Sequence, residues 1–325
     1  MTSVSSIKSV SGSFAVPIVV AVVANDDVQL WDIENSLRLD QVATFSKTPG
    51  VMASLSSDGK MFFAGSYYAG GGMGYSISER REVWRRKDLR RFSSLTSHPF
   101  EPSIFCSFDR KPSLQLDSHT GATLNRLHGV KEVYASPFEP LLIFGSRDLR
   151  IGKSLERANI RIPRTTFAVL DIAFARNLVA VSESGGLVRC FDLSSGKEVW
   201  RYEPTQGVHV LHVSFCPKVN VFVGVDWAYT KKKGDCRLLH FDADTGRCKV
   251  LTRLESALDF AFCLEGLRLV NSEGAVIDTS TGKLVRKLAF AREEYEEPRF
   301  PSWDERIRSG TPAQRELARL LGPPE

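Results

Sequence analysis

Five carboxylates stand where acid-base or metal chemistry could be organised. Each follows an apolar run and precedes a short polar stretch; they are Asp26, Asp109, Asp148, Glu183 and Asp226. If these stretches met around one opening, the carboxylates would ring it, and a metal could complete a hydrolase or lyase site. The chain offers no matching set of histidines. We therefore favour solvation of turns as the role of these carboxylates.

The remaining groups of reactive type also lack a productive spacing. His209 and His212 in "GVHVLH" would point to opposite faces of a strand and could not hold one ion. The sequence has no G-x-S-x-G, no H-E-x-x-H and no glycine-rich loop that opens a helix, since Gly70–Gly72 fall at a predicted hairpin tip. The sequence therefore predicts no catalytic residue, no metal site and no cofactor, and the protein is not expected to be an enzyme.

The cysteines indicate a compartment rather than a reaction. They are scattered without a C-x-x-C pair, at positions 106, 190, 216, 236, 248 and 263. A chain of 325 residues that is 42% hydrophobic can build a large core without disulfides. We interpret the cysteines as small buried side chains in a reducing, cytoplasmic environment.

The elements that would carry these residues repeat along the chain. Residues 19–42 and 177–204 share one layout: an apolar run, a polar turn, an alternating run that ends in aspartate, another turn and a third run. The repeated acidic or hydroxyl position is occupied by Asp32, Ser76, Asp117, Asp192, Asp242 and Asp278, and in the fourth repeat Ser154 lies near it. From Asp32 to Asp278 there are 246 residues over six intervals, a mean spacing of 41. Spacing of this size is typical of propeller blades.

Each repeat also has an alternating leading run, such as "VLHVSFCPKVNVFV", so each contains four strands at hairpin spacing. A four-stranded sheet cannot bury its two apolar faces alone, but seven sheets stacked around an axis can. The predicted fold is therefore all-β, a seven-bladed β-propeller of four-stranded antiparallel blades over residues 1–290. The run "FAVPIVVAVVA" could also be a secretory signal, but the repetition of its layout favours a strand.

The turns between the third and fourth strands carry a specific signature. Glycine follows the aspartate by four residues at Gly121, Gly196, Gly246 and Gly282. Glycine suits a turn position with positive φ, and the aspartate can accept backbone N–H groups.

These repeats resemble WD-repeat propeller blades, on the evidence of "LWDI" at Trp31–Asp32 and of segments such as "VSFCPKVNVFV". "DLSSGKEVWRY" and "DADTGRCKV" also resemble propeller repeats of the pyrroloquinoline-quinone type. The resemblance covers about residues 7–290 and implies a fold rather than a ligand. The Gly-His dipeptide of the WD family is missing, so its buried His-Asp-Ser/Thr-Trp network is not expected.

Residues 291–325 leave the repeat and form a second predicted region, a charged linker and a short helical tail. Ser302 with Glu305 is a capping box, and Thr311–Pro312 with Gln314 is a second one. Either this tail packs on the propeller, or it docks in a partner's groove.

Function is predicted to sit on loops between the second and third strands and between blades, which share one face, called the top. The candidate partner-binding residues are Tyr67, Tyr68, Arg85, Arg86, Arg90, Trp227, Tyr229, Lys231, Lys232 and Lys233. Exposed aromatic and arginine side chains are typical of protein interfaces. The expected partner is another protein with an acidic surface, bound by a scaffold subunit or by a dedicated binder of the immunity-protein kind.

Two other functions remain open at this point. The central channel could hold a small molecule or cofactor, with or without catalysis. The basic loops could bind nucleic acid or an anionic surface, although acidic residues interrupt them and the net charge is only +5. No run of 18 apolar residues predicts a membrane-spanning helix. The oligomeric state does not follow from the sequence.

Overall fold

The computed structural model describes residues 7–23, 26–45, 50–68, 70–145, 148–163, 169–228, 236–254 and 259–290. All of them belong to one compact unit, Met1–Ala291. The predicted helices of the tail lie outside the described residues. Among the described residues, no helix has the length and apolar character needed to cross a membrane.

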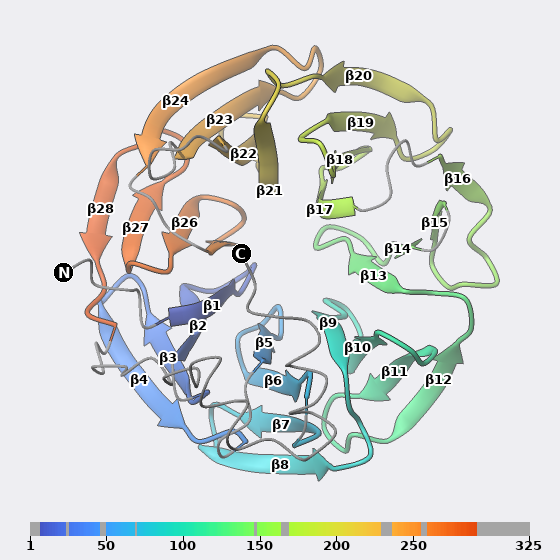
Figure 1. Cartoon of the computed structure of the whole chain (residues 1–325), viewed down its shortest axis with the longest axis vertical. Coiled ribbons are helices and arrows are strands. Elements are labelled where there is room, and N and C mark those ends of the chain that lie inside the picture. The colour runs from blue at the N-terminus through green and yellow to red at the C-terminus, as the bar shows by residue number, and fades with distance from the viewer. Residues whose placement is uncertain are drawn as a thin grey trace, which may run out of the picture. The chain divides into compact units, whose positions relative to one another are not determined.

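The described strands form seven antiparallel sheets of four, arranged as blades around a central axis (Figure 1). The strands nearest the axis are β1 (Ile7–Gly12), β5 (Val51–Leu55), β9 (Phe92–Ser97), β13 (Glu132–Ala135), β17 (Val169–Phe174), β21 (Val208–Cys216) and β25 (Phe260–Cys263). The second strands are β2 (Ile18–Val23), β6 (Met61–Ser66), β10 (Ser103–Phe108), β14 (Leu142–Gly145), β18 (Leu178–Glu183), β22 (Val221–Ala228) and β26 (Arg268–Asn271).

The third strands are β3 (Val28–Asp32), β7 (Gly72–Ser76), β11 (Ser113–Asp117), β15 (Leu149–Gly152), β19 (Val188–Asp192), β23 (Cys236–Asp242) and β27 (Ala275–Asp278). The rim strands are β4 (Leu37–Val42), β8 (Arg81–Arg86), β12 (Thr123–Leu127), β16 (Ile160–Ile162), β20 (Glu198–Tyr202), β24 (Cys248–Leu254) and β28 (Leu284–Lys287). Blades 1 to 7 follow the chain, and strand order in each follows sequence order. The predicted seven-bladed fold is confirmed, and the run tested as a secretory signal contains β2.

The alternation of side chains along each strand explains why the blades stack. In β2, Val19, Ala21 and Val23 join the core between blades 7 and 1, whereas Val20 and Val22 join the core between blades 1 and 2. Successive side chains of a strand point to opposite faces of the sheet. The same arrangement gives one apolar cluster between every pair of adjacent blades.

The predicted turn chemistry is present. At the turn of blade 5, Asp192 Oδ1 accepts the N–H groups of Ser194 and Ser195 at 3.1 and 2.8 Å. Gly196 has φ +68° and donates its N–H to the Asp192 carbonyl at 2.8 Å. Hydrogen bonds from the Ser194 and Ser195 side chains lower the pKa of Asp192 to about 2. The glycines of blades 3, 6 and 7 have φ values of +69° to +71°.

Blades 1 and 2 adopt the same left-handed position without glycine. Ser36 has φ +54° and Arg80 has φ +51°, and a non-glycine residue in this region is strained by about 1 kcal/mol. We therefore expect Ser36→Gly and Arg80→Gly each to raise the free energy of unfolding by roughly 0.5–1 kcal/mol. Urea unfolding measures this. Gly196→Ala is the comparison and should lose more than about 1 kcal/mol, because its Cβ would add a 2.9 Å approach to Ile160 to the backbone strain. A loss of stability in both glycine variants would refute the expectation.

Tryptophans on two rim strands also form hydrogen bonds to the turn of the next blade. Trp84 donates its indole N–H to the Ser118 carbonyl at 2.8 Å, and Trp200 donates to Ala243 at 2.8 Å. A Cβ built on Gly246 would lie 2.6 Å from the Trp200 ring, so the ring packs directly on the glycine. Trp31 of the WD dipeptide instead donates within its own blade, to Gln29 Oε1 at 3.1 Å.

The ring closes between blades 7 and 1 without an exchanged strand among the described residues. Blade 1 supplies its own four strands, and so does blade 7. Val10 donates its backbone N–H to Asp259 at 2.6 Å, and Glu265 donates to the Phe14 carbonyl at 2.6 Å. Side-chain packing, including the edge-on pair of Trp31 and Phe290, completes this junction.

Candidate functional site: the top face and the channel

The loop after β6 presents two tyrosines on the top face of blade 2. The Tyr68 side chain is 65% exposed, whereas Tyr67 is half-buried. The two rings meet edge to face with centroids 5.0 Å apart. Tyr67 donates its hydroxyl to Asp109 of blade 3 at 3.4 Å, and its N–H to the Gly50 carbonyl at 3.0 Å. Tyr67 therefore ties the loop to its surroundings and Tyr68 remains available.

The glycines of this loop are required by its geometry. Gly70 and Gly71 have φ values of +98° and +96°, which few other residues adopt. A Cβ on Gly71 would lie 2.1 Å from the Arg86 carbonyl oxygen and 3.0 Å from Lys87 Cα. The loop thus packs tightly against the connection from blade 2 to blade 3, which makes the two predicted segments neighbours.

Two of the predicted arginines hold blades together. Arg85 pairs with Glu82 at 2.5 Å, donates to the Thr44 carbonyl at 2.9 Å and lies 5.1 Å over the Phe45 ring. Arg86 pairs with Asp88 at 2.5 Å and donates to the Gly121 carbonyl at 2.9 Å. The hydrogen bond with Asp88 raises the pKa of Arg86. Both guanidinium groups are already engaged with blade 1 or blade 3.

Arg90 is free of such contacts among the described residues, apart from a bond to the Lys87 carbonyl at 3.4 Å. Lys87 and Arg91, on the same connection, are also exposed. Arg110 and Lys111, on the loop after β10, are exposed as well, and the sequence analysis did not predict them. The exposed basic neighbours of Arg90 are therefore Lys87, Arg91, Arg110 and Lys111. We call these four residues, with Tyr67, Tyr68 and Arg90, the top-face patch. Arg110 and Lys111 were missed because the loop after β10 is short, and only long loops were interpreted as candidate binding loops.

The second predicted loop is not part of this patch. Trp227, on β22 of blade 6, is half-buried and packs against the core between blades 6 and 7. Blades 7 and 1 separate its blade from blade 2 (Figure 1). Tyr229 and Lys231, Lys232 and Lys233 lie outside the described residues. The structure therefore brings together the tyrosines and Arg90, and leaves Trp227 elsewhere.

Three of the five carboxylates form buried ion pairs. The role predicted from the sequence, solvation of turns, is therefore wrong for these three. Asp226 has a fully buried side chain and lies 2.5 Å from Arg237. Glu183 lies 3.0 Å from Arg189, both nearly fully buried. Asp26 lies 2.9 Å from Lys8. Their basic partners stand on neighbouring strands of the same blade, so no open ring of carboxylates forms at the mouth of the channel.

Three polar side chains do meet in the channel, from the inner strands of blades 5 and 6 and the start of blade 7. His212 Nδ1 lies 3.7 Å from Asp171 and its Nε2 lies 3.8 Å from Asp259. Asp171 accepts the Val213 N–H at 3.0 Å, and Asp259 accepts that of Val10. Burial lowers the pKa of His212, but the two carboxylates outweigh it and the net pKa is raised. The group links successive blades electrostatically.

This linkage predicts a pH dependence. Because the folded pKa of His212 is raised above 6.5, its protonated form stabilises the fold at low pH, and this contribution is lost as pH rises through the folded value. We expect the advantage of the wild type over His212→Gln to shrink by about 1 kcal/mol or less between about pH 6 and pH 8. Urea titrations at several pH values measure the difference in the free energy of unfolding between the two proteins. The contributions of the other histidines cancel in this difference, because both proteins contain them. An advantage that grows with pH would be inconsistent with this assignment.

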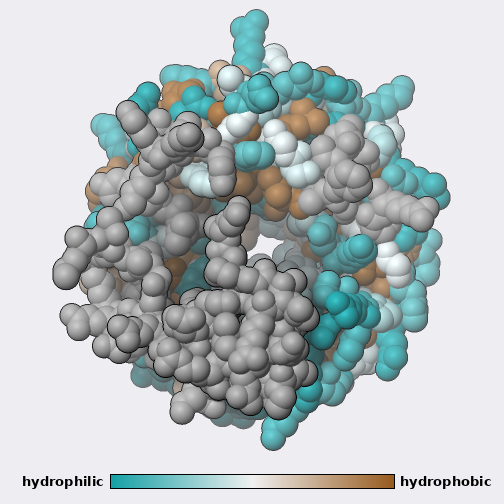
Figure 2. Space-filling view, in the orientation of Figure 1, coloured by the Kyte–Doolittle hydropathy of each residue, from teal (hydrophilic) through white to brown (hydrophobic). Residues whose placement is uncertain are grey.

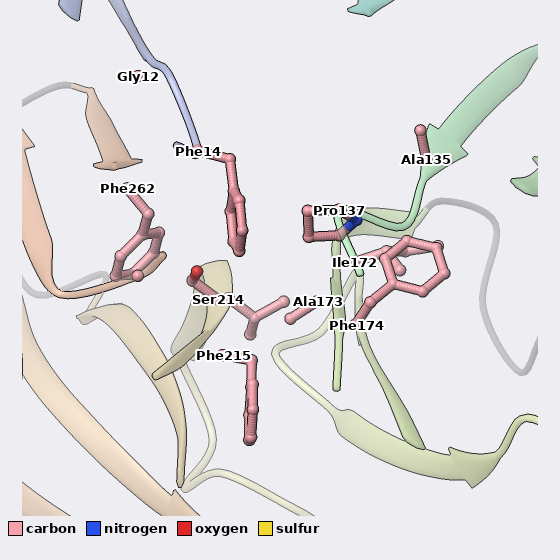
Figure 3. A pocket seen from close by; sticks show the side chains of 12 residues that line it. Gly12, Phe14, Ala135, Pro137, Ile172, Ala173, Phe174, Ser214, Phe215 and Phe262 are labelled. Carbon is pink, nitrogen blue, oxygen red and sulfur yellow. The ribbon is translucent and has the colours of Figure 1, made fainter. Parts of the chain in front are cut away.

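The channel opens at the opposite face from the patch into an apolar cavity of about 230 Å³ (Figure 3). Phe14, Phe174, Phe215 and Phe262 line it, and Ser214 supplies the side-chain hydroxyl of the lining. A second cavity, of about 310 Å³, lies between blades 2 and 3 beside Phe100. Ligand pockets of enzymes combine apolar walls with several convergent polar groups. The first cavity does not gather such groups. The second is lined by several polar side chains, among them Asp58, His98 and Glu101, but His98 Nδ1 already accepts the N–H groups of Phe100 and Glu101 at 3.2 and 3.0 Å.

Among the described side chains, no three histidine, cysteine or acidic groups are arranged so that they could hold a metal ion, the trio around His212 included. The six cysteines are free thiols, and five of them are buried. Burial raises the pKa of Cys190 to about 12 and that of Cys263 to about 12, which disfavours the nucleophilic thiolate. In the space-filling view, hydrophilic side chains dominate the visible rim around a central opening (Figure 2).

Seven four-stranded blades with loops gathered at two faces define the class: the fold is a WD-repeat-like, seven-bladed β-propeller. Solved structures of similar fold are described as RRP9 WD40 repeats (TM-score 0.63, 14% identity, 82% of this chain and 86% of that one) and as U3-55K (0.62, 14%, 82% and 88%). A computationally designed protein, Ika8, is also similar (0.57, 19%, 87% and 86%). No family model and no curated protein matches the chain.

Proposed function

We propose that the protein is a non-enzymatic scaffold that binds another protein through the top-face patch. The observation that carries this proposal is the combination of a tyrosine that is 65% exposed with exposed basic side chains on two adjoining connections, of which Arg110 lies 3.6 Å from Asp109. Tyrosine and arginine are the residues that most often dominate binding energy at interfaces. Five basic side chains of the patch favour a partner with an acidic surface.

The architecture supports the proposal through rigidity. Gly71 packs against Arg86 and Lys87, and Arg85 and Arg86 bridge to the neighbouring blades. The patch is therefore held in place before binding, so that little conformational entropy is lost on association. Such a surface suits a subunit of an assembly, and equally a dedicated binder that blocks its partner. Free thiols throughout favour the cytoplasm.

Nucleic acid is the weaker candidate for the same surface. Asp109 stands within the patch beside Tyr67, and Asp88 pairs with Arg86. Carboxylates repel phosphates, and a single exposed ring offers little stacking. Lys231, Lys232 and Lys233 stay, by sequence, candidate residues for binding an acidic protein at blade 6, apart from the top-face patch.

Affinity capture from native cells, followed by reconstitution with the captured protein, tests this function. We expect one stoichiometric protein partner, and we expect Tyr68→Ala combined with Arg90→Glu to weaken its binding at least about a hundredfold, which corresponds to roughly 3 kcal/mol. Phe100→Ala is the matched control, because Phe100 is 51% exposed on the opposite face. Equal loss in the control, or no loss in the patch variant, would reject the top face.

A further inference from the structure

The rim of blades 6 and 7 carries an unusual concentration of positive charge. Segments 247–254 and 283–288, which contain β24 and β28, hold six basic residues and no acidic one. These residues are Arg247, Lys249, Arg253, Lys283, Arg286 and Lys287. All are exposed except Arg286, which is half-buried. Among the described residues, none of the six lies within ion-pair distance of a carboxylate.

Two other rim strands, β8 and β20, neutralise arginines locally. On β8, Arg85 pairs with Glu82 and Arg86 with Asp88, both at 2.5 Å. On β20, Arg201 pairs with Glu198 at 2.6 Å. β24 and β28 contain no such carboxylates, so the positive charges of this part of the rim repel one another without local neutralisation. An anionic partner would relieve this repulsion.

Apolar side chains lie among these charges. Val250 is 46% exposed, Leu284 is 62% exposed and Val285 is 40% exposed. The two segments contain no aromatic residue, so stacking on nucleic-acid bases is not provided for. The surface thus combines positive charge with aliphatic contacts. We call the six basic residues with Val250, Leu284 and Val285 the rim patch.

The two strands form one continuous surface with an open edge. A Cβ on Gly282, in the turn before β28, would lie 2.9 Å from Leu251 and 3.0 Å from Thr252 of β24. Figure 1 shows β24 and β28 next to each other on the outside of the ring. Each is the last strand of its sheet, and no described strand pairs with its outer edge. Backbone N–H and C=O groups on such an edge can pair with an added strand.

We propose that the rim patch is a second binding surface, which takes an extended protein segment rich in aspartate and glutamate and interspersed with aliphatic residues. The segment lies along the edge of β24, its carboxylates reach the six basic side chains, and its aliphatic groups cover Val250, Leu284 and Val285. An open strand edge favours this occupant over a lipid surface, which has no backbone groups to pair with it. This site is independent of the top-face patch, so each proposal can fail alone.

Fluorescence anisotropy with the full chain tests the rim patch. The probe is a labelled short peptide of alternating glutamate and valine. We expect Lys249→Glu combined with Lys287→Glu to weaken its binding at least about tenfold, or roughly 1.4 kcal/mol, and about 1 M salt to abolish most of it. Lys197→Glu with Lys218→Glu makes the same charge change at exposed lysines elsewhere and should leave binding unchanged. Thermal melts check that all variants fold alike.

Two further probes separate the alternatives. A proline-interrupted version of the peptide keeps the charge but cannot add as a strand, and should bind at least about fivefold more weakly. Equal binding of that version, or equal loss in both lysine pairs, would overturn the proposal. Tighter, patch-dependent binding to phosphatidylserine-rich vesicles or to single-stranded DNA would also overturn it, because the occupant would then be a lipid surface or a nucleic acid.

Discussion

Replacing Trp200 by alanine is expected to lower the free energy of unfolding by about 3–5 kcal/mol. The Trp200 ring is almost completely buried in the core between blades 5 and 6, where it packs on Phe222 and Phe241. It also donates to the Ala243 carbonyl at 2.8 Å. The substitution leaves a large cavity and an unsatisfied carbonyl at the same junction, so two separate terms add to the loss.

The structure supplies matched variants for this experiment. Trp200→Phe keeps most of the ring but removes the N–H, and should lose about 1–2 kcal/mol. Trp84→Ala makes the equivalent change between blades 2 and 3, where Trp84 donates to Ser118, and should lose as much as Trp200→Ala. Val199→Ala, next to Trp200 but 47% exposed, should have little effect. Urea unfolding gives all four values. If Trp200→Ala and Trp84→Ala each lowered the free energy of unfolding by less than about 1 kcal/mol, these tryptophans would not stabilise the junctions between blades as inferred.

The blades could be predicted from the sequence because their determinants are local. The run Val19–Val23 alternates between two faces, and Asp192 with Gly196 marks a turn within five residues. Such patterns depend on strand periodicity and on backbone conformation, which neighbouring residues decide. The degenerate fourth repeat was also predicted, since its four strands keep the common spacing, but the register places Gly152 rather than Ser154 at the position that Asp192 occupies in blade 5.

The site could be predicted less well, because its contacts join residues of different blades. Arg86 was expected to face a partner, yet it donates to Gly121 of blade 3. His212 meets Asp171 and Asp259 only after blades 5, 6 and 7 are stacked. Neither pairing leaves a fixed spacing in the sequence, and the curvature that creates it is a property of the whole ring.

The buried ion pairs show what signal was missed. The notable feature of Asp226 was its place before a loop, which suggested contact with water. Its partner Arg237 follows a loop of variable length, but the two residues are directly opposite in the register of β22 and β23. A hairpin alignment of the two strands across that loop predicts that the Asp226 carboxylate and the Arg237 guanidinium lie side by side.

This pair leads to the second large effect. Replacing Arg237 by methionine is expected to lower the free energy of unfolding by about 3 kcal/mol. Arg237 donates to Asp226 through Nε at 3.0 Å and through Nη2 at 2.5 Å. The Asp226 side chain has no exposure to solvent. Without the guanidinium, the buried carboxylate loses both of these donors and keeps the backbone N–H of Arg237, which donates to Oδ1 at 3.1 Å.

A double variant separates the cost of a stranded charge from the worth of the pair. Asp226→Leu with Arg237→Met removes both charges and keeps similar side-chain volumes. Because exchange of a buried pair for apolar residues is often neutral, we expect the double variant to recover most of the loss seen in Arg237→Met. Urea unfolding of the two variants and the wild type measures the recovery. If the double variant were as unstable as the single one, the pair would contribute directly to stability, and the carboxylate at the end of β22 would be a stabilising element rather than a charge that merely requires its partner.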